Sequence, residues 1–252
     1  VTDYPYSFFD NADILNPSFF IGRWSIRSQD DLKKIKMRSI QYIKMDYLSD
    51  HSFLNDALLV AGNYSDTPPW PVTPVWTSKW LMDELYNYGY SKVDTAFWTN
   101  LNPIDNYPIS TAWNQGVGVI GYRGWGGGTG WANPDFRNPD LEVLVNNWKL
   151  PVVFSFVCNT GDFNRPGGDH CFAEKAITVG SPDIPTGAVA VVGPSDKDTD
   201  TKFNNPMYGT IMDALLEQRV PELAPALYAG KQCNTSKNRA KPVRKRFHEI
   251  VT

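Results

Sequence analysis

The sequence predicts an α/β fold with a mostly parallel sheet, and two patterns carry that prediction. Six short apolar runs alternate with stretches of helical character along the 252 residues. The runs are nearly continuous in Val, Ile, Leu and Phe and do not alternate with polar residues, as in strands that are buried on both faces. Strand and helix in alternation at this spacing favour a sandwich, so we expect a six-stranded sheet with helices on both faces.

The expected elements follow in chain order. Strands are predicted at residues 19–26, 57–62, 93–98, 117–122, 152–158 and 188–192. Helices are predicted between them at residues 29–47, 78–88, 139–148, 171–179 and 205–217. Asp30 and Asp31 support the start of the first helix, because carboxylates interact favourably with the amino-terminal end of the helix dipole. The proline-containing stretches 68–71 and 102–108 are interpreted as surface loops.

Composition excludes several classes of protein. Hydrophobic residues make up 42% of the chain and the net charge is only −3, which argues against a disordered protein. The longest apolar runs, such as 152–158, are far shorter than the roughly 20 residues of a membrane-spanning helix, so no membrane span is expected. Three cysteines without a CxxC pair predict neither a disulfide framework nor a structural zinc site.

The small net charge conceals a marked asymmetry. Residues 231–252 carry seven basic residues against Glu249 alone, which gives +6, so the first 230 residues carry −9. A basic run of this kind is usually a solvated face, and we expect no nucleic-acid partner. The predicted organisation is therefore a domain over residues 1–230, followed by a basic segment, 231–252, that ends the same domain.

In an open parallel sheet, binding and catalytic residues gather at the carboxyl ends of the strands. Three such ends carry suitable residues in this sequence. They are residues 122–128, 158–163 and 193–196. We therefore expect a functional site where these three segments meet.

Cys158 is the strongest candidate for a catalytic residue. A hydrophobic strand ends at this cysteine, and Asn159-Thr160-Gly161 then turns the chain. A rigid strand can aim a nucleophilic sulfur, and a turn exposes backbone N–H groups that can stabilise an oxyanion. The alternative is a buried cysteine that packs as a small hydrophobic residue.

The glycines between Gly116 and Gly130 form a second motif. Residues 116–121 satisfy the GxGxxG pattern, but they lie inside a predicted strand and do not open a helix after it, so a dinucleotide site is not predicted. No phosphate-binding GxxxxGK[ST] loop is present. The glycines after the strand indicate either a loop whose backbone approaches a ligand closely or a tight turn.

Asp196, Asp198 and Asp200 alternate in the sequence SDKDTD. Their oxygens could hold a structural Ca²⁺ ion, which is the only cofactor that the sequence suggests. The glycine and distant glutamate of an EF-hand are missing, so a solvated acidic loop is the competing interpretation.

Several segments in order resemble the gingipain-type cysteine endopeptidases. They include DYPYSFFDNADILNPSFFIGRWSI near the start, then LLVAGNY, GVGVIGYRGWGGGTGW, VCNTGDF and CFAEKAITVGSPDIPTGAVAVVGPSD. The resemblance extends from Asp3 to about Gly230. It implies a caspase-like three-layer α/β sandwich, a protein or peptide substrate, and secretion or display at a bacterial cell surface through type IX secretion. It also implies further domains in a larger secreted protein.

The resemblance assigns roles to several residues. Cys158 takes the position of the nucleophile, and backbone amides around Gly126 and Asn159 take the position of the oxyanion donors. Cys171, in CFAEKA, matches a second family cysteine with a structural role. The family's catalytic histidine stands between two glycines, and this chain has Trp125 there.

The tryptophan changes the expected chemistry. An indole has only an N–H donor, so Trp125 cannot accept a proton from the thiol. Without an imidazolium neighbour, the Cys158 thiol is expected to stay mostly protonated at neutral pH. Another base such as His170 could assist, Arg123 could favour the thiolate electrostatically, or the site is inactive.

Two functions are therefore predicted as alternatives. The first is a secreted cysteine endopeptidase that acts through Cys158 without the usual histidine. The second is an inactive caspase-fold module that serves peptide binding or surface assembly.

Overall fold

The structure is a computed structural model that describes residues 3–9, 16–63, 73–165, 167–197, 199 and 201–235. The chain divides into two compact units. One unit is Trp24–Thr199, and the other combines Val1–Arg23 with Asp200–Thr252. None of the described helices is long and apolar enough to cross a membrane.

A five-stranded parallel sheet forms the centre of the Trp24–Thr199 unit. Its order is β2-β1-β3-β7-β8, and every neighbouring pair is parallel. The strands are β1 (Asp56–Gly62), β2 (Lys92–Trp98), β3 (Val119–Arg123), β7 (Val152–Phe156) and β8 (Ala190–Val192). Parallel strands need crossover connections, and the helices α2 (Thr73–Tyr88) and α3 (Tyr107–Gln115) supply the first two.

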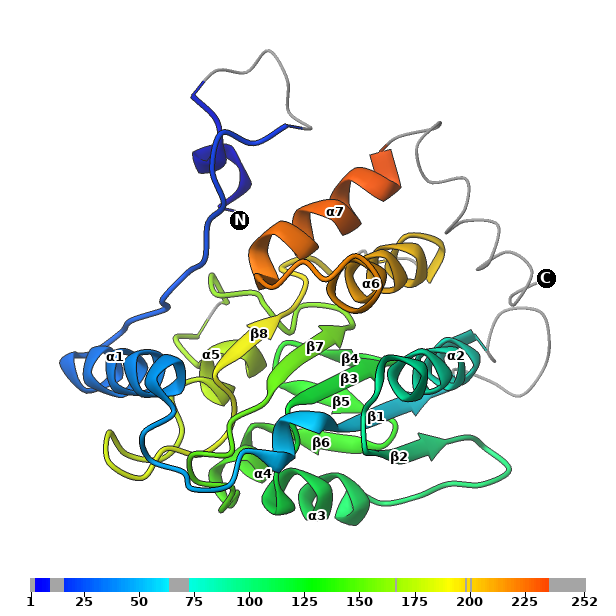
Figure 1. Cartoon of the computed structure of the whole chain (residues 1–252), viewed down its shortest axis with the longest axis horizontal. Helices are drawn as coiled ribbons and strands as arrows, with labels where there is room; N and C mark the ends of the chain where they lie inside the picture. The colour runs from blue at the N-terminus through cyan, green and yellow to red at the C-terminus, as the bar shows by residue number, and fades with distance from the viewer. Residues whose placement is uncertain are drawn as a thin grey trace. The chain divides into compact units, whose positions relative to one another are not determined.

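The sheet is covered on both faces. α2 packs on β1, β2 and β3, and α3 packs on β1 and β2 from the opposite face (Figure 1). Leu58 and Val60 of β1 belong to the main core cluster with Trp113 of α3, whereas the equally buried Leu59 lies outside that cluster. Because successive side chains of a strand point to opposite faces, this alternation explains why β1 is apolar from Ala57 onward.

A small antiparallel sheet follows β3. It consists of β4 (Gly126–Gly127), β5 (Gly130–Ala132) and β6 (Asp135–Arg137). Trp131 of β5 is completely buried, stacks on Tyr122 with ring centroids 4.4 Å apart, and donates its Nε1–H to Ser155 Oγ at 2.9 Å. This indole thereby joins the small sheet to β3 and β7 of the large one.

Two short helices and one long helix complete this unit. α4 (Asn138–Glu142) and α5 (Phe172–Ala176) contact each other, and α5 also contacts β8. α1 (Gln29–Lys44) begins after Ser28, whose side chain accepts a hydrogen bond from the Asp31 amide. The helical turn η2 (Ser52–Asn55) leads directly into β1.

The second unit is built on α6 (Thr201–Leu216) and α7 (Leu223–Thr235), which pack against each other. Gly230 permits the close approach, because a Cβ there would lie 2.9 Å from the carbonyl oxygen of Met207. The turn η1 (Tyr4–Ser7) adds Tyr4, whose ring stacks on Tyr228 of α7. Lys231 holds its ammonium group 4.5 Å from the centre of the Tyr4 ring.

The predicted fold class is confirmed, with corrections to individual elements. The parallel sheet has five described strands, and residues 19–26 are wrong as a sixth because Phe20 and Trp24 are half exposed and pair with no strand. The predicted loop 102–108 is correct as far as Asn106, but α3 begins at Tyr107, where no helix was predicted. The predicted helix 139–148 is much shorter than expected. The division of the chain at residue 230 stays a prediction, since most of the basic segment 231–252 lies outside the described residues.

Candidate active site

The carboxyl ends of β3 and β7 meet at one edge of the large sheet. Arg123, the last residue of β3, is paired with Phe156, the last residue of β7. The segments that follow the two strands therefore leave the sheet side by side. They are Gly124-Trp125-Gly126 after β3 and Val157-Cys158 after β7. The predicted nucleophile and the predicted oxyanion-donor segment are thus brought to the same place.

Gly126 packs against Val157, the residue before Cys158. A Cβ on Gly126 would lie 3.2 Å from the Val157 Cγ2 atom and 2.5 Å from the carbonyl oxygen of Gly130. Only a glycine fits between these groups. Gly126 and Gly127 form a short strand against Val157, and Gly128-Thr129 make the tight turn that returns the chain to Gly130, so the tight-turn interpretation holds for this part of the motif.

Cys158 is partly exposed, as a nucleophile that meets a substrate must be. Its Sγ lies 3.2 Å from the hydroxyl oxygen of Thr199, and either group can be the donor. Within the described residues no histidine forms a hydrogen bond with this sulfur. A threonine hydroxyl can share a hydrogen bond with a thiol or thiolate, but it is not a general base at neutral pH.

The turn after Cys158 is held from two sides. Asn159 adopts a left-handed conformation with a φ of 59°. The buried Thr160 hydroxyl donates to the Val157 carbonyl oxygen at 3.2 Å. From the other side, the amides of Asn159 and Gly161 donate to the carbonyl oxygens of Asp196 and Pro194, at 3.0 and 2.8 Å.

These bonds bear on the role predicted for Asn159. Its own amide already has an acceptor, the Asp196 carbonyl oxygen. Asn159 as an oxyanion donor stays a prediction, and its observed contribution is to shape the turn. The segment after β8 thus contacts Cys158 through Thr199 and also binds the amides of Asn159 and Gly161 in the turn.

Trp125 stands on the surface of this edge, with 62% of its area exposed. Its backbone is fixed, because its carbonyl oxygen accepts from the Tyr122 hydroxyl at 2.6 Å and from the Ala132 amide at 2.9 Å. The indole is therefore presented at the site by a rigid support. It presents an aromatic surface and carries no proton acceptor.

Comparison with known proteins assigns this arrangement to a family. The sequence model of peptidase family C25 matches residues 1–249. The chain belongs to peptidase family C25.

Individual C25 relatives agree with that assignment. Gingipain R2 and Gingipain R1 of Porphyromonas gingivalis are each 28% identical over 222 residues, or 85% of this chain. The match covers only 28% and 21% of those proteins, so this chain spans about a quarter of their length.

Solved structures support the fold. The Arg-specific cysteine proteinase gingipain R superposes with a TM-score of 0.80 at 23% identity, covering 94% of this chain and 54% of that one. The complex of the Porphyromonas gingivalis RgpB pro- and mature domains also gives 0.80, covering 96% and 56%. The predicted gingipain-type family and caspase-like α/β fold are therefore confirmed.

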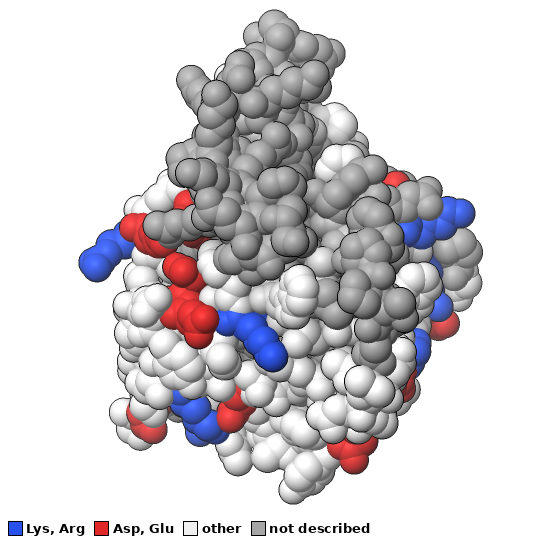
Figure 2. All heavy atoms as spheres, turned by 90° about the vertical axis from the view of Figure 1, so that its right-hand side faces the viewer, with Lys and Arg blue, Asp and Glu red and all other residues white. Residues whose placement is uncertain are grey.

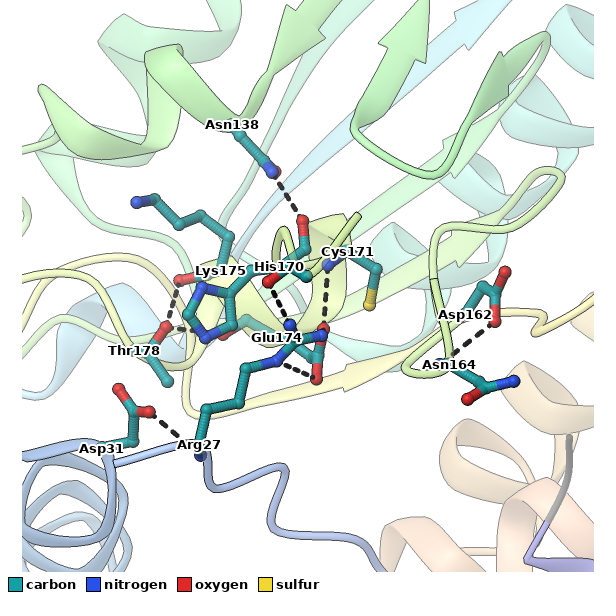
Figure 3. Close-up of polar contacts among 11 residues, drawn as sticks. Arg27, Asp31, Asn138, Asp162, Asn164, His170, Cys171, Glu174, Lys175 and Thr178 are labelled. Atoms are coloured by element: carbon teal, nitrogen blue, oxygen red, sulfur yellow. Dashed lines mark hydrogen bonds and ion pairs between the residues drawn. The ribbon is translucent and has the colours of Figure 1, made fainter. Parts of the chain in front are cut away.

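His170, the alternative base, belongs to a different cluster of this C25 domain (Figure 3). Its carbonyl oxygen accepts from Asn138 Nδ2 at 2.9 Å. The adjacent Cys171 caps α5, since its amide donates to Glu174 Oε2 at 2.9 Å and its side chain accepts from the Glu174 amide. Arg27 forms an ion pair with the same carboxylate at 2.9 Å. None of these bonds connects His170 to Cys158, so nothing in the described contacts supports it as the base.

The Cys171 thiol and the Arg123 guanidinium are both buried in the protein interior. Burial raises the pKa of the Cys171 thiol to about 12, and the residue is completely inaccessible. Cys171 is therefore held as a neutral thiol. The guanidinium of Arg123 is also inaccessible and donates to the Phe156 carbonyl oxygen at 2.6 Å, two residues before Cys158.

The calcium prediction is largely outside the described part of the chain. Asp198 and Asp200 are not among the described residues, and Asp196 contributes its carbonyl oxygen to the Cys158 turn. In the described ranges no group of three or more His, Cys, Asp or Glu side chains is arranged to hold a metal ion. A structural Ca²⁺ at this segment stays a prediction.

On the side of the molecule that lies at the right in Figure 1, the described residues carry charges of both signs. Figure 2 shows Lys and Arg side chains interspersed with Asp and Glu side chains over the described face, without a continuous basic area.

Sequence reasoning missed two neighbours of the site. Thr199 was not expected near Cys158, from which it lies 41 positions away in the chain. Arg165 was not considered, although its side chain packs on Gly128 of the glycine segment. Both contacts arise from tertiary packing, and no local motif marks them.

Proposed function

We propose that this chain is the cysteine-peptidase domain of a larger secreted or surface protein, acting on peptide substrates through Cys158. The observation that carries the proposal is the position of Cys158 at the carboxyl end of β7, beside the glycine strand at Gly126. A rigid strand aims the sulfur, and extended glycine backbone beside it offers amide groups to a substrate carbonyl.

The chemical step needs a proton acceptor, and none of the described residues places one at the sulfur. The Cys158 thiol loses its proton to solvent, the thiolate forms a bond to the peptide carbonyl carbon, and the scissile C–N bond breaks. The leaving amine takes up a proton from solvent. Water then cleaves the thioester, releasing a carboxylic acid and restoring the thiol. Because positioned acid–base groups typically contribute about 10² to 10⁴ in rate, this domain should be slower than an enzyme with a histidine at position 125.

Trp125 supports a second candidate function. An exposed indole at the edge of the site can pack on a peptide but cannot move a proton. The alternative is therefore a domain that binds peptides, or other parts of a surface assembly, without cleaving them.

A thiol-reactive peptide probe distinguishes these functions. A peptidyl acyloxymethyl ketone should label Cys158 faster than Cys171 or Cys233, as measured by mass spectrometry of tryptic peptides. Cleavage of a peptide library that disappears in the Cys158→Ala variant would support the peptidase. Peptide binding with neither cleavage nor preferential labelling would support the binding module.

The Trp125→His variant tests what the missing histidine costs. It should raise the rate of Cys158 labelling and of peptide cleavage by at least tenfold, because it supplies an imidazole after the end of β3, which is paired with the end of β7 before Cys158. Trp125→Phe is the matched control, since it opens similar space without a base. An equal gain in both variants would contradict the acid–base explanation.

A further inference from the structure

Arg165 follows Cys158 by seven residues and returns to the glycine segment beside it. A Cβ on Gly128 would lie 3.3 Å from the Arg165 Cδ atom, 3.4 Å from Nε and 3.7 Å from Cζ. The guanidinium therefore lies over Gly128. Gly126, two residues earlier, packs on Val157, and two residues of chain span at most about 7 Å. Arg165 is thus within a residue or two of peptide length from the Cys158 edge.

This guanidinium differs from every other arginine of the Trp24–Thr199 unit. The others donate to carbonyl or carboxylate oxygens: Arg27 to Glu174, Arg38 to four carbonyls, Arg123 to Phe156 and Arg137 to Asp135. Arg165 makes no hydrogen bond or ion pair within the described part of the chain; its side chain is half-buried, with Nη1 covered and the rest of the guanidinium accessible. The nearest acid in sequence, Asp162, accepts a hydrogen bond from the Asn164 amide (Figure 3).

A buried donor of this kind is expensive to leave without an acceptor. Its desolvation costs about 1–3 kcal/mol, and more when the group is charged. The planar guanidinium fork suits a carboxylate, which can accept two parallel hydrogen bonds from it. A ligand carboxylate that pairs with the accessible nitrogens of this guanidinium would balance its charge beside the buried Nη1.

The glycine segment leaves room for such a ligand. A Cβ on Gly127, between the two packed glycines, would have no atom within 4 Å. One face of this segment therefore packs against the domain, while Gly127 borders open space. A peptide chain lying along it would pass both the Cys158 edge and the Arg165 guanidinium.

We infer that Arg165 is a specificity-determining residue that recognises a carboxylate of the bound peptide, either an Asp or Glu side chain or a chain terminus. The inference rests on the proposed function, because it needs a peptide at the Cys158 site. It gives this domain a selectivity of its own. A solved structure that resembles it is described as Arg-specific, and a guanidinium at this position repels an arginine in the same subsite.

Peptide binding tests the inference without requiring turnover. The Cys158→Ala protein is titrated with fluorescent, amino-acetylated and carboxyl-amidated octapeptides of neutral sequence, each with a single Asp or the matched Asn at one of the eight positions. Anisotropy gives the Kd of each. One position should show Asp bound about tenfold more tightly than Asn, as expected for a charge-assisted hydrogen bond. The same neutral peptides with a free carboxyl terminus test recognition of the chain end.

Three variants in the same background identify the recognising group. Arg165→Gln should bring the Asp-to-Asn ratio to about one, and Arg165→Lys should retain part of it because the charge remains without the fork. Arg137→Gln is the matched control, since that guanidinium is already paired with Asp135, and it should leave the ratio unchanged.

The outcomes separate this inference from the proposed function. Binding without carboxylate preference, or a preference that survives Arg165→Gln, overturns the inference alone. A preference seen only with the free carboxyl terminus supports the inference and assigns the carboxylate to the chain end. Absence of peptide binding overturns the inference in every case. It overturns the proposed function as well only if the ketone probe also fails to label Cys158 preferentially in the wild-type protein.

Discussion

The Sγ atom of Cys158 lies 3.2 Å from the Oγ1 atom of Thr199, although the two residues are 41 positions apart in the chain. The Thr199 hydroxyl is therefore in direct hydrogen-bonding contact with the sulfur of the candidate nucleophile. Among the described residues, this hydroxyl is the group best placed to stabilise a thiolate at Cys158.

Removing the Thr199 hydroxyl should make Cys158 less reactive. A single hydrogen bond is worth about 1 kcal/mol, so Thr199→Val should slow alkylation of Cys158 by iodoacetamide roughly fivefold at neutral pH. Thr199→Ser keeps the hydroxyl and should react at a rate close to that of the wild type. Rates are measured by mass spectrometry of the labelled tryptic peptide. Faster alkylation in the valine variant would instead show that Thr199 restrains the thiol.

Adjacent glycines in the strand beside Cys158 should respond differently to alanine. In Gly126→Ala the new methyl group would meet the Gly130 carbonyl oxygen at 2.5 Å and the Trp131 Cα at 3.2 Å, so the strand must move. We expect a loss of about 1–3 kcal/mol in the free energy of unfolding, as for an overpacked core site. Gly127→Ala has open space and should change stability by less than about 0.5 kcal/mol. Urea titration measures both, and equal effects would contradict the packing described for β4.

Some of this site was predictable because it depends on local patterns. The continuous apolar run before Cys158 and the Asn-Thr-Gly turn after it predict that this cysteine follows the end of a strand, where the structure has it. The register of parallel strands then brings Trp125 to the same edge, because Arg123 pairs with Phe156.

Other features depend on contacts that no local pattern contains. The strands β4–β6 are short and rich in glycine, and their order comes from the burial of Trp131 against Ser155. Residues 19–26 have the composition of a strand, yet no neighbouring strand pairs with them. Thr199 and Arg165 reach the site only through tertiary packing, so spacing in the sequence could not indicate them.

Titration of Cys171 should weaken the fold at alkaline pH. Burial raises its thiol pKa from 9.0 to about 12, so below pH 9 both the folded and the unfolded state hold the proton. Above pH 9 the unfolded state loses its proton while the folded state keeps it, and the free energy of unfolding falls until about pH 12. The slope from this group is at most about 1.4 kcal/mol per pH unit.

The Cys171→Ser variant isolates that contribution. A serine hydroxyl does not titrate in this range and can still cap α5. Urea unfolding between about pH 8 and pH 10 should show a smaller fall for the variant than for the wild type. This range stays below that in which Tyr90 contributes, since burial raises its pKa from 10.0 to about 12. Parallel curves for the two proteins would contradict a neutral, buried Cys171.

Arg38 should be among the residues on which stability depends most. Its guanidinium is completely buried and donates to four backbone carbonyls, those of Ala176, Val179, Thr186 and Ala188. The bonds hold the chain between α5 and β8, from which the segment that contacts Cys158 continues. Burial also lowers the pKa of Arg38 to about 10, so the group remains charged at neutral pH.

Arg38→Met should therefore lower the free energy of unfolding by about 3 kcal/mol or more, because it leaves several buried carbonyls without their donors. Lys36→Met is the matched control on the same helix, where the lysine is exposed, and it should change stability by less than about 0.5 kcal/mol. Urea titration at neutral pH measures both variants. A loss below 1 kcal/mol for Arg38→Met would mean that the carbonyls find other donors and that α1 does not hold this chain through Arg38.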